Sequence, residues 1–120
     1  MTEITKKDFE KLNLRVGKIK AVKPHPKTKD YVLLISLGPA GTEKQLVADL
    51  KEGYTKEELV GKQVLFVQNM EPITVKGVES IGLLLVTHKN EKPVLVQPEK
   101  KVETGMKASG LTNIVIEHHE

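Results

Sequence analysis

The amino-acid sequence predicts an all-β fold built as one small barrel. Short apolar segments alternate with turn residues along the 120-residue chain, and a short helical pattern interrupts them after the third segment. The chain has two Tyr, two Phe and no Trp, so the core has to be built from Val, Leu and Ile. The length suits a single domain over residues 1–120, and no repeat or linker indicates a second one.

The first expected strand covers residues 14–22, and its apolar phase changes across Gly17. Such a phase change predicts a β-bulge or a tight bend, which a strand coiling around a small barrel requires. The later apolar segments are also read as strands or short extended pieces, and they cover residues 31–38, 44–50, 63–69, 82–88, 93–97 and 112–117.

Two short helices are expected. Thr5 is followed three residues later by Asp8, which predicts a capped helix start over residues 5–12. Thr55 and Glu58 form the Thr-x-x-Glu capping box, and Gly61 lies where a helix C-terminal cap belongs. This second helix separates the third expected strand from the fourth.

An order of three strands, a helix and two strands is that of the OB-fold, a five-stranded Greek-key barrel. The remaining extended segments then form a C-terminal extension, and an SH3-like barrel is the structural alternative. OB-folds bind oligonucleotides on the loops between strands 1 and 2 and between strands 4 and 5. Those loops are residues 23–30 and 69–80 in this chain.

The net charge of +3 is unevenly distributed. Residues 1–30 contain nine basic and four acidic side chains, a balance of +5, whereas residues 31–120 contain ten basic and twelve acidic ones, a balance of −2. The basic first quarter favours a polyanionic partner, with a solvated lysine-rich surface as the plain alternative. The lysines expected to contact such a partner are Lys18, Lys20, Lys27 and Lys29.

Several classes of protein are disfavoured by the sequence. There is no cysteine, no run of about 18 apolar residues and no apolar signal core at the charged start, so we expect a cytoplasmic protein without a membrane partner. None of the four histidines has H-x-x-x-H spacing, and no phosphate-binding glycine motif occurs, so we expect neither a metal nor a cofactor.

Four side chains invite a chemical interpretation. Ser80 in GVESIG does not match the G-x-S-x-G elbow of serine hydrolases and precedes a strand rather than a helix, so we expect no catalytic residue. His25 lies between two prolines, where packing on its own loop is favoured over contact with a phosphate. Tyr31 and Tyr54 are candidates either for base stacking or for the core.

Five motifs occur together in one order along the chain. They are LRVGKI at residues 14–19, HP at 25–26, EELVGK at 57–62, N-x-x-P at 69–72 and GVES-x-G at 77–82. Together they resemble the tRNA-binding domain of methionyl-tRNA synthetases, of the phenylalanyl-tRNA synthetase β chain and of cytokine-like synthetase cofactors. The resemblance covers about residues 9–110 and also extends to free-standing dimers, one a tRNA-binding protein and one an export-related chaperone.

This resemblance implies an OB-fold that binds tRNA by shape and backbone, without catalysis. It implies nucleic-acid contacts from Asn69, Lys76 and Ser80, with Leu83 beside them. It also implies a homodimer formed by the residues after Asn90, acting free-standing or as an accessory subunit of a methionyl-tRNA synthetase.

The chain departs from the family pattern in the loop between strands 4 and 5. Glu71 and Thr74 stand where basic residues are expected, and Leu83 stands where methionine is usual. Each lost cation weakens the counterion release that dominates nucleic-acid affinity. The alternative function is therefore a dimeric chaperone-like module that binds unfolded polypeptide and has reduced tRNA affinity.

Overall fold

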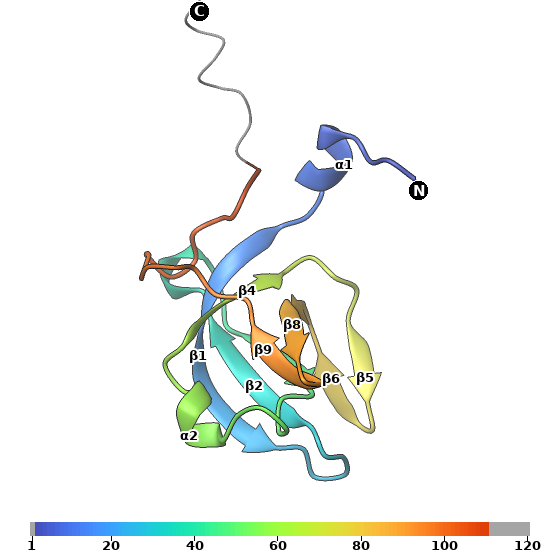
Figure 1. Ribbon diagram of the computed structural model, residues 1–120, viewed down its shortest axis with the longest axis vertical. Helices are drawn as coiled ribbons and strands as arrows, with labels where there is room; N and C mark the ends of the chain where they lie inside the picture. The colour runs from blue at the N-terminus through green and yellow to red at the C-terminus, as the bar shows by residue number, and fades with distance from the viewer. Residues whose placement is uncertain (1, 111–120) are drawn as a thin grey trace, which may run out of the picture.

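The computed structural model describes residues 2–110, and antiparallel strands make up most of that range (Figure 1). One sheet consists of β1 (Leu14–Pro24), β2 (Tyr31–Ser36), β3 (Lys44–Ala48), β4 (Gln63–Val67) and β7 (Leu83–Leu84). Two separate hairpins consist of β5 (Ile73–Val75) with β6 (Val78–Ser80), and of β8 (Val86–Lys89) with β9 (Lys92–Leu95). The helical elements are α1 (Lys6–Glu10), α2 (Lys56–Leu59) and the 3-10 turn η1 (Gly38–Ala40).

The sheet has the order β3-β2-β1-β4-β7, so the long strand β1 pairs with β2 and with β4. The opening between the edge strands β3 and β7 is narrowed by β6, which lies against β3. Just after β6, the Ile81 amide donates a hydrogen bond of 2.8 Å to the Gln45 carbonyl of β3. The result is a nearly closed barrel with α2 between β3 and β4, and the predicted OB-fold is confirmed.

The barrel interior is aliphatic, as the composition predicts. Its completely buried side chains include Ile19, Leu33, Ile35, Leu46, Val64 and Phe66. Both tyrosines belong to this core rather than to a stacking surface. Tyr31 is buried and its hydroxyl donates to the Tyr54 carbonyl, while the Tyr54 hydroxyl accepts from the Leu95 amide.

The bend in β1 lies three residues later than expected. The pairing of β1 with β2 shifts between Ile19 and Ala21, which makes Lys20 the bulged residue, whereas the pairing with β4 continues unbroken through Gly17. Gly17 is required for packing instead. A Cβ atom there would lie 2.3 Å from Cγ2 of Ile35 and 2.9 Å from the Phe66 ring, too close for any side chain.

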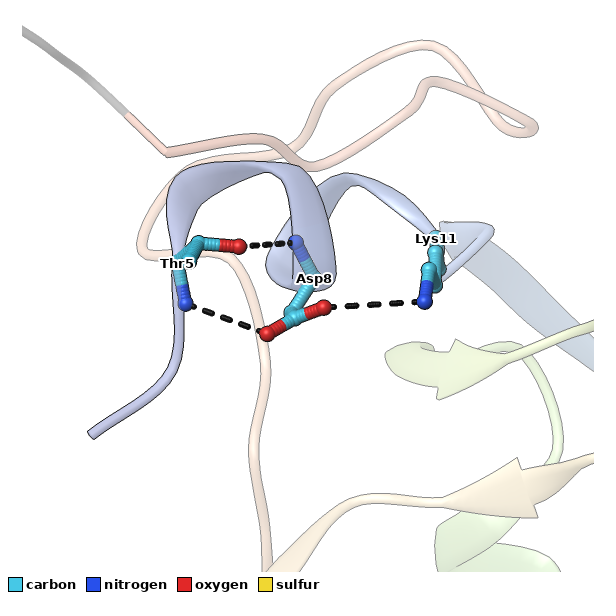
Figure 2. Close-up of polar contacts among 3 residues, drawn as sticks. All are labelled: Thr5, Asp8 and Lys11. Atoms are coloured by element: carbon cyan, nitrogen blue, oxygen red, sulfur yellow. Dashed lines mark hydrogen bonds and ion pairs between the residues drawn. The ribbon is translucent and has the colours of Figure 1, made fainter. Parts of the chain in front are cut away.

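Both helices begin with the capping box that the sequence predicts. In α1 the Thr5 hydroxyl accepts from the Asp8 amide at 3.0 Å, and the Thr5 amide donates to the Asp8 carboxylate at 3.2 Å (Figure 2). Thr55 and Glu58 make the same pair of bonds at α2. Both helices are shorter than expected, and no helix in residues 2–110 is long and apolar enough to span a bilayer.

The expected strand over residues 82–88 is divided into two. Leu83 and Leu84 pair with β4, the Leu85 amide donates to the Leu65 carbonyl, and Val86 onwards turns away to pair with β9. The apolar run is continuous through this change of partner, so its pattern contains no signal for the break. The preceding segment, expected as a loop, contains the β5–β6 hairpin.

The chain after Asn90 packs along the barrel, as expected. The Val96 amide donates to Leu85, and further on the Val16 amide donates to the Met106 carbonyl at 2.9 Å. The Ala108 amide donates to the Leu14 carbonyl at 2.8 Å, so residues 105–108 continue the edge of β1 that β2 leaves free. The last expected strand, residues 112–117, lies outside the described residues.

Candidate nucleic-acid interface

The β5–β6 hairpin projects from the barrel and ends in Lys76 and Gly77 (Figure 1). Val75 pairs with Val78, which leaves a two-residue turn, and both turn residues have positive φ, 45° for Lys76 and 90° for Gly77. These values are those of a type I′ turn, which matches the twist of a hairpin. Because the turn fixes its backbone, the exposed Lys76 ammonium is presented from a defined position at the hairpin tip.

A buried histidine connects this hairpin to the loop between β1 and β2. His25 is only 4% exposed. Its Nδ1 accepts a hydrogen bond of 2.9 Å from the Lys27 amide, so the proton is on Nε2, which donates to the Val75 carbonyl at 2.7 Å. The prediction that His25 packs on its own loop is confirmed, and the structure adds the bond to the hairpin.

The same loop is held in shape by its own polar groups. The His25 amide donates to the Asp30 carbonyl, and the Asp30 amide donates to the Thr28 hydroxyl. Lys27 and Lys29 remain exposed on this loop. Through His25, the backbone of Lys27 lies one side chain away from the hairpin tip, so three of the predicted lysines share one end of the barrel.

Ser80 lies inside the molecule rather than on a ligand-facing rim. The side chain is 5% exposed, and its hydroxyl accepts a hydrogen bond of 2.9 Å from the Val47 amide of β3. Beside it, the Gln45 side-chain amide donates to the Glu79 carbonyl. These bonds fasten the β5–β6 hairpin to β3, so the geometry gives Ser80 a positioning role, and a direct RNA contact stays a prediction.

Asn69 lies at the other end of the barrel from the hairpin tip. Its Oδ1 accepts from the Asn13 amide at 2.8 Å, and its Nδ2 donates to the Lys11 carbonyl at 2.7 Å. These two bonds join the end of β4 to the link between α1 and β1. The structure therefore does not bring Asn69 together with Lys76.

The two predicted lysines on β1 differ in their surroundings. Lys20, the bulged residue, forms an ion pair with Glu43, so part of its charge is already compensated. Lys18 is exposed and lies in register with Gln63 of β4 and Ser36 of β2, on the outer surface of the sheet. Neither lysine is at the hairpin end of the barrel.

Leu83 lies in a groove between β3 and the β8–β9 hairpin, and the lining of this groove combines apolar side chains with Asp49, Ser80 and His88. The groove has a volume of about 290 Å³, and its lining includes the exposed side chains of Ile73, Leu83 and Val86. No lysine or arginine lines it, so this surface is unlike the cationic hairpin tip next to it. A contact between Leu83 and nucleic acid stays a prediction, and the sequence contains no signal for the groove, which is assembled from separate segments of the chain.

The described residues offer no metal site. Within residues 2–110, no three His, Cys, Asp or Glu side chains come close enough to hold an ion. In the same range no histidine is hydrogen-bonded to the Ser80 hydroxyl, which accepts from the Val47 amide. The chemistry that this arrangement supports is the binding of anionic and apolar ligand groups.

Comparison with known proteins agrees with this geometry. Residues 14–107 match the model of a family described as a putative tRNA binding domain. A methionine–tRNA ligase of Pyrococcus furiosus is 43% identical over 108 residues, which are 89% of this chain and 15% of the ligase. The chain thus spans about a seventh of the length of the curated relatives it matches.

Two solved structures have the same fold over nearly the whole chain. A MetRS-related protein from Pyrococcus horikoshii has a TM-score of 0.80 at 28% identity, covering 90% of this chain and 99% of that one. A CsaA chaperone protein from Picrophilus torridus has a TM-score of 0.83 at 30% identity, covering 89% and 100%. With most of its length matched by the family model, this chain belongs to the tRNA-binding domain family.

Proposed function

We propose that this chain binds tRNA without catalysing a reaction, through the end of the barrel where the β1–β2 loop and the β5–β6 hairpin meet. The observation that carries the proposal is the His25 contact, which holds Lys76 beside the loop that presents Lys27 and Lys29. Lysines presented at fixed positions suit the phosphates of a folded RNA better than the edges of its bases. The name of the matched family supports the same ligand.

We also propose a role for this chain in association with a synthetase. The curated relatives are methionine–tRNA ligases, and this chain corresponds to a small part of each. A binding domain of this kind would lend tRNA affinity to such a synthetase, as part of it or as an accessory subunit. Co-purification of the chain with a methionyl-tRNA synthetase tests this role, and a chain that never associates with one contradicts it.

Titration of total tRNA at two salt concentrations tests the binding itself. The informative variant is Lys76→Asn, because asparagine tolerates the positive φ of this position and Asn-Gly is a preferred type I′ turn. The variant removes the cation and keeps the hairpin. We expect affinity to fall about five- to eightfold at 0.1 M salt, since log K falls by about 0.7–0.9 per phosphate contact for each decade of salt.

The matched control is Lys92→Asn, which removes an exposed lysine from the β8–β9 hairpin. It should leave tRNA affinity close to that of the unaltered protein. If the protein binds tRNA no better than an unstructured single-stranded RNA of the same length, the proposed recognition of tRNA shape is wrong.

A second candidate function is supported by the exposed apolar side chains of Ile73, Leu83 and Val86, which lie together in the groove between β3 and the β8–β9 hairpin. An extended apolar segment of an unfolded polypeptide fits such a groove, and one structural neighbour is named a chaperone. Competition distinguishes the two functions. If Leu83→Glu abolishes the binding of an unfolded polypeptide while excess tRNA does not displace that polypeptide from the unaltered protein, the two ligands use separate surfaces. If the unaltered protein binds no polypeptide at all, the chaperone function is excluded.

We also propose that the chain forms a two-fold homodimer through the end that carries α1 and residues 106–110, the last described part of the segment after Asn90. Leu12 and Met106 are exposed there, and a groove of about 370 Å³ between Phe9 and Ala108 is partly apolar. Exposed apolar side chains at this end would be buried by a self-complementary interface. Light scattering over a range of concentrations tests this, and a monomer mass throughout contradicts it.

A further inference from the structure

A second cationic surface lies on the other side of the barrel from the β5–β6 hairpin. It is a cleft of about 300 Å³ that is lined by residues from the middle of β1, the start of β4 and the segment that follows β9. Its lining includes Lys18, Lys100 and Lys101, and we call it the basic cleft. The charge pattern of the sequence indicated Lys18 but gave no reason to connect it with the other two, which lie about 80 residues further along.

The segment that supplies Lys100 and Lys101 is fastened to the barrel at both ends by one residue, Gln63. The Gln63 side chain donates to the Val102 carbonyl at 2.6 Å and accepts from the Val102 amide at 3.1 Å. Its backbone carbonyl accepts from the Gln97 side chain at 2.9 Å. Residues 98–101 therefore form a short arch that starts and ends at the same strand position.

Gln63 also fixes the third lysine relative to this arch, because it is the register partner of Lys18 in the β1–β4 ladder. The wall between them contains Gly61, where a Cβ atom would have no neighbour within 4 Å, so the cleft is open on this side. Through its pairing with Lys18 and its bonds to Gln97 and Val102, Gln63 therefore holds Lys18 and the 98–101 arch around the same opening.

The positive charge of the cleft is only partly compensated by the residues that line it. Glu99 is the one acidic residue among those that line it, against three lysines. None of the three lysines forms an ion pair with any residue between 2 and 110, whereas Lys20 on the same strand is paired with Glu43. An excess of about two positive charges is therefore available to an anion from solution.

We propose that the basic cleft binds a backbone phosphate of the same RNA, away from the hairpin tip. This inference rests on the proposed function and deepens it. Ammonium groups on flexible stems, exposed around a shallow opening, suit the point charge of a phosphate rather than a ligand that needs rigid bidentate donors. β1 runs from Lys18 to the loop of Lys27, so its outer surface connects the two cationic regions.

The distance between the two regions suits a folded RNA. From Lys18 to Pro24 the strand extends for about 20 Å at roughly 3.3 Å per residue. A surface of that length accommodates several successive phosphates. A folded RNA that contacts both ends would be read by its shape, whereas a short oligonucleotide would occupy one region only.

The test compares two double variants that remove the same charge from the full chain. Lys100→Ala with Lys101→Ala removes the arch cations, and Lys89→Ala with Lys92→Ala removes an in-register pair of exposed lysines from the β8–β9 hairpin. We expect the first to weaken tRNA binding about fivefold or more per lost contact at 0.1 M salt, with the salt slope reduced by about 0.7–0.9 per contact. The second should stay near the unaltered protein.

Two further readouts separate a phosphate contact from a general effect of charge. Lys100→Arg with Lys101→Arg should retain most of the affinity, because charge is conserved. Ethylation of RNA phosphates should interfere with binding at one or more positions for the unaltered protein, and that interference should disappear for the alanine double variant. Equal losses in both alanine variants, or an unchanged interference pattern, would overturn the inference.

The result also distinguishes this inference from the proposed function. If the unaltered protein binds tRNA and the arch variant binds it equally well, the cleft has no role in RNA binding and the proposed function stands. If the unaltered protein binds no tRNA, the proposed function itself is wrong and the cleft is not an RNA site.

Discussion

Two ends of this barrel are joined to distant segments by the same kind of contact, a side chain that bonds to backbone groups far away in the sequence. At one end His25 bonds to Val75, 50 residues on, and at the other end Asn69 bonds to Asn13 and Lys11, 56 and 58 residues back. Each side chain makes two hydrogen bonds to the backbone. By connectivity alone, the two contacts look equivalent.

They differ in their access to water. His25 is almost completely buried, whereas Asn69 is exposed. A backbone group that loses a buried partner stays unsatisfied, while an exposed group is rehydrated, so the same number of bonds has a different effect on stability. The two contacts also differ in function, because the buried His25 contact positions the lysines that are predicted to bind phosphates.

The largest effect is expected from His25→Ala. This change removes the donor to the Val75 carbonyl and the acceptor of the Lys27 amide at a buried site, at a cost of about 3 kcal/mol in the free energy of unfolding. It also releases the hairpin from the loop, so tRNA affinity should fall with the charge unchanged. Denaturant unfolding and hydrogen exchange of the β5–β6 amides measure the two effects.

The matched control for this prediction is His88→Ala, which removes an exposed histidine from the neighbouring β8–β9 hairpin. It should change neither stability nor hairpin exchange appreciably. If the β5–β6 amides exchange at the same rate in His25→Ala as in the unaltered protein, His25 does not hold the hairpin.

Ser80→Ala is the next largest change. The Val47 amide loses its acceptor at a buried position, which should lower the free energy of unfolding by about 1–2 kcal/mol. Thr42→Ala, at an exposed hydroxyl between η1 and β3, is the control. A direct role in RNA contact predicts a further loss of affinity after correction for stability, whereas a positioning role alone predicts that Ser80→Thr, which keeps the hydroxyl, restores binding.

The difference between local and distant contacts also explains how far the sequence could predict this molecule. Both capping boxes were recognisable because Thr5 and Asp8, and Thr55 and Glu58, are three residues apart. The motifs do not show whether the helix that follows packs against the core. α2 buries Leu59 completely and α1 buries nothing, although their first turns have the same chemistry.

The misassigned elements have the same physical origin. The β5–β6 hairpin was expected as a loop because its strands are three residues long and its Lys-Gly turn is not one of the common type I′ pairs. The pairing of His25 with Val75 and of Gln63 with Val102 leaves no periodic trace in the sequence. The lysines themselves were predictable as cations, whereas their grouping into two surfaces depends on those long-range bonds.

Asn69→Ala removes the exposed contact, in which the Asn69 side chain bonds to the backbone of Asn13 and Lys11. Water can replace both lost partners, so the free energy of unfolding should fall by only about 0.5–1 kcal/mol. The change should be local to the link between α1 and β1, where amide exchange of Asn13 should accelerate. A loss as large as that of His25→Ala would show that burial does not set the difference between the two contacts.

The smallest effect on stability is expected at α1, which precedes the segment that Asn69 contacts. The Thr5 amide, which donates to the Asp8 carboxylate, lowers the pKa of that carboxyl below its usual value, and the nearby Thr5 side chain and Lys11 ammonium lower it further. Figure 2 shows the Thr5 amide and the Lys11 ammonium on the two carboxylate oxygens. A depressed pKa means that ionised Asp8 stabilises the folded helix above the carboxyl's ordinary pKa, and that this contribution is lost as pH falls through the lowered value. NMR titration of the Thr5 amide should follow that pKa, and Asp8→Asn should remove the transition. Because Asp8 is exposed and α1 buries no side chain, barrel stability should not change over the same pH range. A parallel loss of barrel stability that Asp8→Asn abolishes would show that α1 is coupled to the core.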